Sequence, residues 1–484
     1  MIKFIDKILC QFKICFSRVN TFKWFVIVVI GLMIRTDKLG TTSIIRDLSL
    51  NPKVYETMNL FFRSDGWCLN RVKQKWFEIV SQSPKLCKEE DYTILIGDGT
   101  KQAKEGKRMP GVKKMFQESE NSSKPAYISG HMFGGIGILA GDKIKKYCIP
   151  LFINIQDGIQ TIHSWTKSPQ ESEESQKLPS HVIQMIDNGY EAAKTFGKSL
   201  LLLDRYFLSV PALQRLKEHA GLGDTIMHLV TKAKKSCVAY EPPPKKKPAR
   251  GRPCKKGASV KLKELFQSKA NEFQESTVEI YDKEEKIRYY CVDLLWGQKL
   301  YQKLRFVLVE YKGIQSILVS TDITLSPTAI VRLYGYRFKI ECTFRELKQV
   351  IGGFSYQFWC KSLPKENRYS KKGEKKAIEQ VTSSKHQMSI QKTVKAIEGY
   401  VMFSCIALGL LQMASLHFSD HIRKKNIRYL RTPSKSIVSE ASVVHYFRAN
   451  LFRLLGRSPH LTITRFIFEK QALPDDSSDY FQVA

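Results

Sequence analysis

The sequence has few acidic residues for its length and no paired cysteine motif. Its 484 residues contain 46 Asp and Glu against 78 Lys and Arg, which gives a formal net charge of +32. This imbalance favours a polyanionic partner, with nucleic acid first and an anionic membrane surface second. The 11 cysteines occur singly, without a Cys-x-x-Cys pair, which argues against a zinc ribbon or a disulfide miniprotein. We interpret them as reduced cytosolic thiols.

Long apolar runs are also scarce. Residues 24–34 are apolar but too short to cross a bilayer, and no small-residue cleavage site of a signal peptide follows them. Residues 399–417 carry no formal charge and reach the length of a membrane span. Gln412, serines and two glycines dilute their hydrophobicity, so we expect a buried core helix. A membrane anchor is the alternative.

The first half of the chain changes from helical to strand patterns. Residues 1–85 have apolar side chains at helical spacing. Within 90–235, short apolar runs predict strands, and helices are expected at 181–195 and 209–219. Three neighbouring strands followed by helix, strand, helix and strand predict a mixed α/β layer. The expected strands are 92–96, 136–140, 147–155, 199–203 and 225–230.

The next region begins with a segment that cannot pack a core. Residues 241–257 are dominated by Pro, Lys and Arg, which predicts a solvated linker. Residues 277–295 and 304–325 are rich in Val, Ile, Tyr and Thr and predict two β-hairpins. We therefore expect 236–325 to be a basic linker followed by a β-rich insertion.

The last part is mainly helical. Ser326 and Pro327 supply an N-cap and a first-turn proline, which predicts one long helix over 328–350. We expect residues 326–362 to complete the α/β core. Residues 363–484 should form a basic loop and a C-terminal helical region with a role in dimerisation.

Two aspartates follow predicted strands. Asp98 comes after the apolar run 93–96, and Asp204 ends the run 200–203. We expect the chain to turn at each of them, which would present both carboxylates at the sheet edge. An aspartate after a buried strand also serves as a turn or N-cap residue, and this alternative stays open for either residue alone.

The predicted helix over 328–350 carries a polar stripe. Tyr334, Arg337, Glu341 and Lys348 fall within about 60° of one face at about 100° per residue. An exposed salt-bridge face would also place Arg337 four residues before Glu341. Apolar residues border the stripe, so we expect it to lie near a packed surface.

The spacing Tyr334-x-x-Arg337-x-x-x-Glu341-(six residues)-Lys348 resembles the Tyr-Arg-Glu-Lys signature of bacterial insertion-sequence transposases of the DDE class. The segments around Asp98 and Asp204 resemble that group's first and second aspartate motifs. The resemblance covers about residues 90–360 and implies an RNase H-like core: a mixed five-stranded sheet with flanking helices, interrupted by a β-rich insertion. More loosely, the N-terminal helical region is similar to the group's terminal-repeat DNA-binding region.

The resemblance implies that Asp98, Asp204 and Glu341 form a catalytic, metal-binding triad. Three converging carboxylates repel one another unless divalent cations neutralise them. Oxygen ligands favour two Mg²⁺ ions, with Mn²⁺ able to substitute. The expected reaction is cut-and-paste transposition of an insertion element. DNA is cleaved at the element's ends, and the freed 3′-hydroxyls are joined to target DNA.

The resemblance also implies that Tyr334, Arg337 and Lys348 hold the DNA backbone beside the scissile phosphate. Arg250 and Arg252 in the basic linker resemble an AT-hook, in which Arg-Gly-Arg enters the minor groove. A plain solvated linker explains the same residues.

The expected partners are double-stranded DNA, as terminal inverted repeats and target, and a second copy of the chain assembled on DNA. The expected location is the bacterial cytoplasm, associated with the nucleoid and without a membrane. One alternative is a catalytically inactive or repurposed DNA-binding protein derived from a transposase; another is a membrane-anchored DNA-binding protein. Trp296, His131 and His163 are interpreted as core residues rather than as functional ones.

Overall fold

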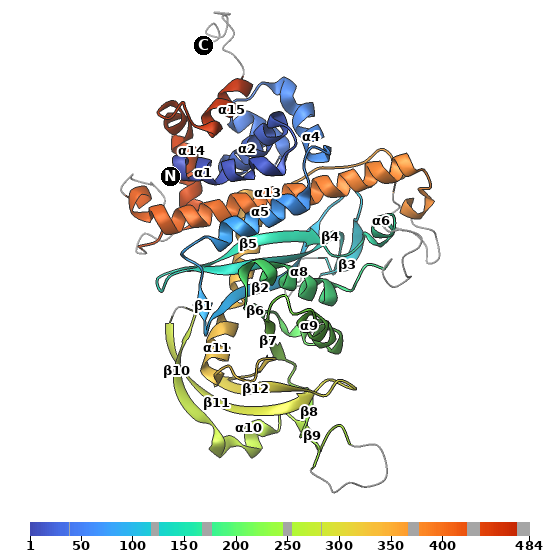
Figure 1. Cartoon of the computed structure of the whole chain (residues 1–484), viewed down its shortest axis with the longest axis vertical. Coiled ribbons are helices and arrows are strands. Elements are labelled where there is room, and N and C mark those ends of the chain that lie inside the picture. The colour runs from blue at the N-terminus through green and yellow to red at the C-terminus, as the bar shows by residue number, and fades with distance from the viewer. Residues whose placement is uncertain are drawn as a thin grey trace, which may run out of the picture.

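The computed structural model describes residues 1–37, 39–117, 125–166, 177–244, 254–281, 283–365, 377–423 and 436–471. Figure 1 shows helices from both ends of the chain at one end of the molecule, a central sheet, and a β-rich insertion at the other end. The long helix α13 (Ser384–Arg423) separates the terminal helices from the sheet.

The central sheet has the strand order that the RNase H-like prediction requires. Its five core strands lie in the order β5-β4-β2-β6-β7, with β2, β4 and β5 antiparallel and with β6 and β7 parallel to β2. The predicted mixed five-stranded core is therefore confirmed. The core strands are β2 (Tyr92–Ala103), β4 (Tyr127–Gly141), β5 (Lys146–Ile155), β6 (Ser199–Leu202) and β7 (Met227–Ala233).

The insertion extends this sheet instead of forming a separate layer. Its strand β13 pairs antiparallel with β7, so a single 13-stranded sheet runs through the described residues. The two predicted hairpins are present as β10–β11 and β12–β13. The insertion contains β8 (Val238–Tyr240), β9 (Ser259–Lys261), α10 (Leu265–Ser268), β10 (Gln274–Ile280), β11 (Lys283–Trp296), β12 (Gln302–Tyr311) and β13 (Ile314–Ser320).

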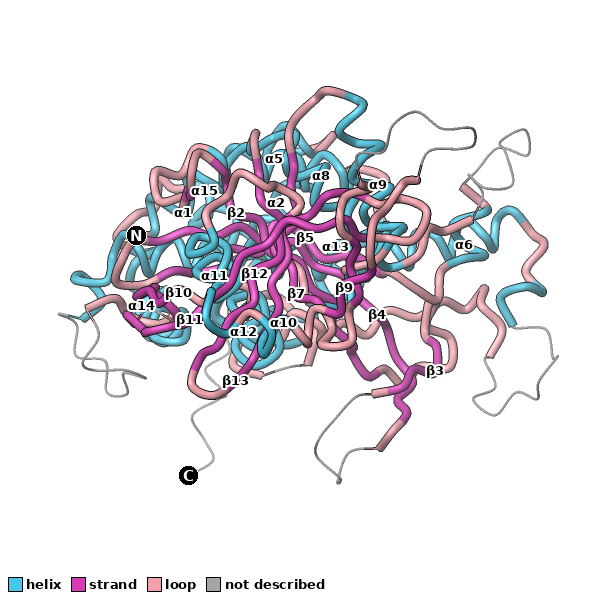
Figure 2. Tube along the Cα trace, turned by 90° about the horizontal axis from the view of Figure 1, so that it is seen from below, coloured by secondary structure: helices cyan, strands magenta, loops and turns pink. Residues whose placement is uncertain are grey.

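Helices cover the sheet, as the view from below shows with the strands gathered in the middle (Figure 2). Helix α8 (His181–Phe196) packs on β4 and β2 and against α9 (Val210–Leu222), while α5 (Leu69–Ser81) packs on β5. The smaller elements are β1 (Lys88–Glu89), β3 (Lys113–Phe116), α6 (Gln160–Ser164) and 3₁₀ turns at Gln11–Cys15, Pro52–Val54, Arg205–Phe207, Ala270–Glu272 and Ala377–Gln380.

Helix α13 contains the apolar stretch 399–417 and is a core helix. It is long and apolar enough to cross a membrane, but 83% of its most apolar window is buried inside the fold. A tryptophan ring packs against each of its two glycines. A Cβ at Gly409 would lie 2.4 Å from Cζ2 of Trp76, and one at Gly399 would lie 2.5 Å from Cη2 of Trp67. The glycines therefore allow close helix packing, and the expected buried helix is confirmed.

The N-terminal and C-terminal helices share one core. Helix α2 packs against α13, α14 and α15, so the helical regions predicted separately at 1–85 and 363–484 form one body. The helix α2 is apolar on all sides because it is surrounded by these neighbours. These helices are α1 (Ile2–Cys10), α2 (Val19–Ile34), α3 (Thr41–Asp47), α4 (Tyr55–Arg63), α14 (Glu440–Gly456) and α15 (Thr462–Lys470).

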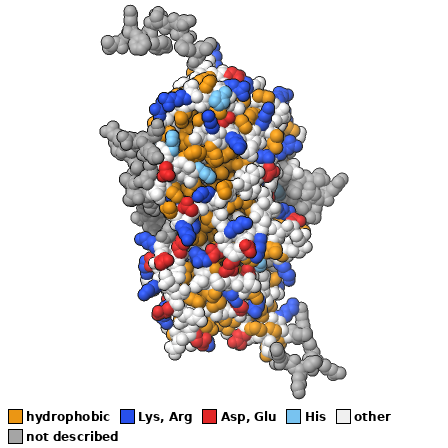
Figure 3. Space-filling model, turned by 60° about the vertical axis from the view of Figure 1, so that its left-hand side comes forward, with side chains coloured by type: hydrophobic (Ala, Val, Ile, Leu, Met, Phe, Trp, Pro, Cys, Tyr) orange, Lys and Arg blue, Asp and Glu red, His pale blue; other side chains and the backbone are white. Residues whose placement is uncertain are grey.

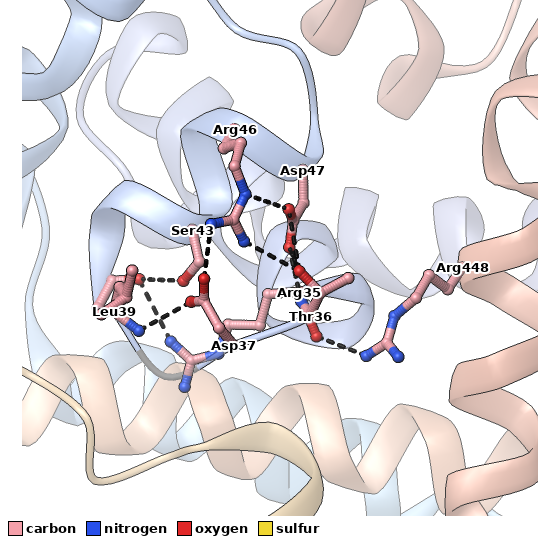
Figure 4. A network of polar contacts seen from close by, with 9 residues as sticks. Arg35, Thr36, Asp37, Leu39, Ser43, Arg46, Asp47 and Arg448 are labelled. Carbon is pink, nitrogen blue, oxygen red and sulfur yellow. Dashed lines mark hydrogen bonds and ion pairs between the residues drawn. The ribbon is translucent and has the colours of Figure 1, made fainter.

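A polar network fixes the turn between α2 and α3 (Figure 4). Asp47 accepts from the backbone N–H of Thr36 at 2.6 Å. Arg448 of α14 reaches the same turn and donates to the carbonyls of Ile34 at 2.7 Å and Arg35 at 2.5 Å. The turn is thus tied to the C-terminal helices.

Candidate active site

Asp98 lies inside a long strand, not at a turn. The parallel pairing of β2 with β6 ends at Ile96 and Leu202, but β2 continues to Ala103 along β4, with Asp98 opposite Gly135. The expectation of a turn at Asp98 is therefore wrong. The antiparallel partner β4 keeps the polar half of β2 extended, and the hydrophobic pattern could not indicate this.

Asp204 does stand where its strand ends. It directly precedes the 3₁₀ turn Arg205–Phe207, and its side chain makes no capping hydrogen bond there. Its carbonyl accepts from the Thr231 hydroxyl of β7 at 2.9 Å. Asp98 and Asp204 each lie two residues beyond the last parallel pair, so both carboxylates belong to the same edge of the core.

The predicted long helix is divided in the structure. Ser326 caps the N–H of Ala329 at 3.2 Å, and α11 (Pro327–Tyr336) begins at Pro327 as predicted. The chain then tightens at Arg337, whose N–H bonds the carbonyl of Tyr334, before α12 (Lys339–Glu346). A π-helical turn, Leu347–Ile351, follows and ends at Gly352, whose φ of 63° suits glycine. The expectation of one continuous helix over 328–350 is therefore wrong.

Helix α12 is fixed on the sheet beside Asp98. The Thr343 hydroxyl donates to the carbonyl of Cys148 in β5 at 2.6 Å. Phe344 packs over Gly135, where a Cβ would come within 2.9 Å of the ring. These contacts, and the absence of a side chain at Gly135, set the distance between α12 and the sheet.

Arg337 joins the first and third of the predicted carboxylates. Its guanidinium donates to Oδ2 of Asp98 at 3.1 Å and to Oε1 of Glu341. The Arg337 side chain is only 15% exposed, whereas that of Glu341 is 55% exposed. The pair is therefore not a solvated surface salt bridge, because its arginine points inward to β2.

The remaining stripe residues also face the core edge. The Lys348 ammonium donates to the Thr100 hydroxyl at 2.7 Å and to the carbonyl of Lys101 at 3.3 Å. Tyr334 is partly buried, and burial is the main cause that raises its pKa. The negative charges of Asp204 and Asp98 also raise the pKa of Tyr334. The stripe thus faces both aspartates.

The electrostatics of the site follow from this arrangement. Burial raises the pKa of Asp98 to about 6, the Arg337 charge opposes that rise, and the charges of Glu341 and Asp204 add to it. Although burial lowers the pKa of Arg337, the carboxylates of Asp98 and Glu341 raise it, and the net shift is upward. Carboxylates placed together in this way gain from a cation that is shared between them.

The ligand atoms that the predicted triad offers are of the kind that a hard divalent cation prefers. Asp98, Asp204 and Glu341 offer carboxylate oxygens, which Mg²⁺ prefers. Across the described ranges, however, no three His, Cys, Asp or Glu side chains are grouped closely enough to hold a metal ion. The guanidinium of Arg337 lies between Asp98 and Glu341, so these two carboxylates meet through arginine.

Sequence reasoning missed several neighbours of this site. Lys232 of β7 is close enough to Asp204 and Arg337 to feel both charges, although burial is the main cause that lowers its pKa. The ring of Tyr281, at the β10–β11 turn, lies 5.0 Å from that of Phe338, between α11 and α12. The burial pattern of β7 does not alternate, so no periodic signal marked Lys232.

Other predicted residues lie elsewhere. Arg250 and Arg252 fall outside the residues that the structure describes. Trp296 is partly buried against the core. His131 is fully buried: its Nε2 donates to the carbonyl of Pro110 at 2.8 Å, so its Nδ1 accepts from the Tyr356 hydroxyl at 2.6 Å. The core interpretation of His131 is confirmed.

Comparison with known proteins gives one family. The sequence profile of a family described as DDE superfamily endonuclease matches residues 11–286, more than half of the chain. The match ends before Glu341, so it includes Asp98 and Asp204 but not the proposed third carboxylate. No curated protein and no solved structure gave a significant match.

Proposed function

Since the chain belongs to the DDE superfamily of endonucleases, we propose that it is a transposase that moves an insertion element by cutting and joining DNA. One contact supports this above the others: Arg337 donates to both Asp98 and Glu341, beside the strand end that carries Asp204. Residues far apart in the sequence thereby meet at the edge of an RNase H-like core. The Tyr-Arg-Glu-Lys subgroup is part of the proposal.

In this proposal Asp98, Asp204 and Glu341 hold two Mg²⁺ ions, with Mn²⁺ able to substitute. Such ions supply charge stabilisation at the attacking and leaving oxygens of phosphoryl transfer. The protein side chains provide the ligands and the alignment. The planar fork of Arg337, which contacts Asp98 and Glu341 in this structure, could also hold a phosphate through two N–H groups.

The other residues of the stripe position the DNA backbone. Lys348 acts as a point charge toward phosphate, and Tyr334 donates its hydroxyl. Lys348 lies at Thr100, two residues beyond Asp98 on β2, so a phosphate that it holds lies next to the carboxylates. Arg250 and Arg252 would add minor-groove contacts from the basic linker.

The reaction proposed is cleavage at the element's terminal inverted repeats and transfer of the 3′-hydroxyls to target DNA. Two ends must be paired before transfer, so a homodimer on DNA is proposed. The N-terminal helical region would bind the terminal repeats. A bacterial cytoplasmic, nucleoid-associated location goes with this function.

On the face of the molecule in Figure 3, Lys and Arg side chains spread from the helical end to the insertion, while Asp and Glu gather mainly over the lower half. The net charge of +32 favours binding of a polyanion, and on this face the helical end is the part with the fewest acidic side chains.

The test is nicking of supercoiled DNA that carries the element's ends, with Mg²⁺. We expect Glu341→Gln to slow nicking at least about a hundredfold while DNA binding in EDTA stays unchanged. The matched control is Asp224→Asn, which removes an exposed carboxylate that pairs with Lys194 at 2.8 Å. Nicking by Glu341→Gln at the control rate would contradict the proposal.

A catalytically inactive DNA-binding protein is the second candidate. The ion pairs of Arg337 with Asp98 and Glu341 favour this candidate, because they occupy two of the carboxylates that would hold the metal ions. Tight DNA binding without nicking, in both Mg²⁺ and Mn²⁺, would select this alternative.

A further inference from the structure

A polar pocket lies where α4 approaches the segment that follows the active-site helix. It has a volume of about 420 Å³, which falls in the range of small-molecule sites. A pocket of this size admits one nucleotide but not a double helix, whose major groove alone is about 12 Å wide. The lining residues are Tyr55, Asn59 and Arg63 of α4, residues 357–361, and Ser389 and Thr393 of α13.

Aromatic side chains are exposed at this pocket. Trp359 is 52% exposed and Tyr55 is 47% exposed. A single exposed aromatic side chain is common on protein surfaces, but here two of them line the same pocket. Every nucleobase has a π-face that such a ring can stack on.

The pocket is also positive. Its lining contains Arg63 and Lys361 and no carboxylate. Arg63 is held in place: it donates to the carbonyl of Trp359 at 3.0 Å, and its guanidinium lies 5.7 Å from the centre of the Phe358 ring. A fixed guanidinium beside an exposed indole ring matches a phosphate next to a base.

The pocket is connected to the active site by short, rigid links. Lys104, the first residue after β2, donates to the carbonyls of Phe354 at 2.6 Å and Tyr356 at 2.8 Å. The N–H of Cys360 donates to the carbonyl of Arg108 at 2.9 Å. From Asp98 to Lys104 the chain spans about 20 Å at strand spacing. At about 3.4 Å per base pair, this distance equals roughly six base pairs of DNA.

We infer that this pocket binds one unpaired nucleotide of the DNA substrate, with the base stacked on Trp359 and a neighbouring phosphate at Arg63 and Lys361. This inference extends the proposed function, because it takes DNA as the ligand. Asn59 and Gln357 supply amide groups that can hydrogen-bond a base edge. The site would hold a strand that has left the double helix roughly six base pairs from the cleavage point.

The test measures binding of a fluorescein-labelled oligothymidylate of about ten nucleotides by anisotropy, with EDTA present. We expect Trp359→Ala to weaken binding roughly five- to hundredfold, and Trp359→Phe to retain most of the affinity. The control is Phe452→Ala, which removes a 42% exposed aromatic side chain of α14 and should bind like the wild type. An abasic strand of the same length should bind the wild type and Trp359→Ala equally weakly.

Two results would overturn the inference. One is binding of the oligothymidylate by Trp359→Ala within twofold of the control. The other is an equal loss on the abasic strand, since a ring that acts only through the fold would weaken both ligands. The assay contains no metal and no cleavage step. Absent nicking with a retained Trp359 effect would therefore refute the enzyme assignment and leave this binding site standing.

Discussion

Arg35 should be the residue through which the N-terminal helices hold α12 and the π-helical turn Leu347–Ile351 in place. It lies at the end of α2, is 2% exposed, and donates from Nε to the carbonyl of Ile351 at 2.8 Å. It also donates to the carbonyl of Gly352, at the end of the π-helical turn that contains Lys348. Its other partners are the Tyr400 hydroxyl at 2.5 Å and the carbonyl of Gly40 at 3.3 Å.

The expected loss in the free energy of unfolding depends on the buried hydrogen-bond acceptors that Arg35→Ala would leave unpaired. Hydrogen bonds to a charged donor are worth about 1.5–3 kcal/mol each, and a buried acceptor that loses its partner costs about 1–3 kcal/mol. Removal of the buried charge recovers part of this, so we expect a net loss of about 3–5 kcal/mol in the free energy of unfolding. Arg35→Lys keeps the charge but cannot span both carbonyls, and it should lose about half as much.

Urea unfolding followed by circular dichroism measures this loss, with Arg465→Ala as the exposed control on α15. Folded Arg35→Lys should also nick DNA more slowly, because the π-helical turn that contains Lys348 is less firmly held. An Arg35→Ala protein within about 1 kcal/mol of the control would refute the reasoning.

Three further outcomes are expected. The pKa of His131 is lowered by burial to about 4, so the unfolded state binds the proton first as pH falls from 6.5 to 4. The wild type should lose up to about 3 kcal/mol over this window, and unfolding curves of His131→Gln should lack that part of the loss. Gly409→Val places side-chain atoms where the Trp76 ring lies, and we expect its thermal unfolding midpoint to drop by several degrees or more. Lys348→Ala should weaken DNA binding at all sequences and reduce the slope of log affinity against log salt by about one charge, measured by anisotropy titrations.

The core strands could be predicted because their buried halves are continuous apolar runs. Residues 92–96 and 199–203 mark the parallel pair β2 and β6 in this way. The second half of β2 is polar, and it stays extended because β4 pairs with it. That pairing joins residues far apart in the chain and leaves no local pattern, so Asp98 was expected at a turn.

For the candidate site, sequence spacing could predict which residues share a helix face but not which contacts they make. Helical spacing put Arg337 and Glu341 on one face, and the structure has them in contact. Spacing cannot show that Arg337 also reaches Asp98 on strand β2. Gly335 lies two residues before the division of the helix at Arg337, but an isolated glycine inside a helical pattern is tolerated and does not by itself predict a break. Likewise, the shared core of the terminal helices depends on long-range packing that periodicity does not record.

The central claim is that Asp98, Asp204 and Glu341 share divalent cations. Replacing Mg²⁺ by Fe²⁺ and generating hydroxyl radicals cuts a polypeptide next to the bound metal, and the fragments can be mapped by mass spectrometry. We predict cuts near all three residues, suppressed by excess Mg²⁺ and by Asp98→Asn. Cuts confined to one carboxylate, or unaffected by Asp98→Asn, would contradict the claim.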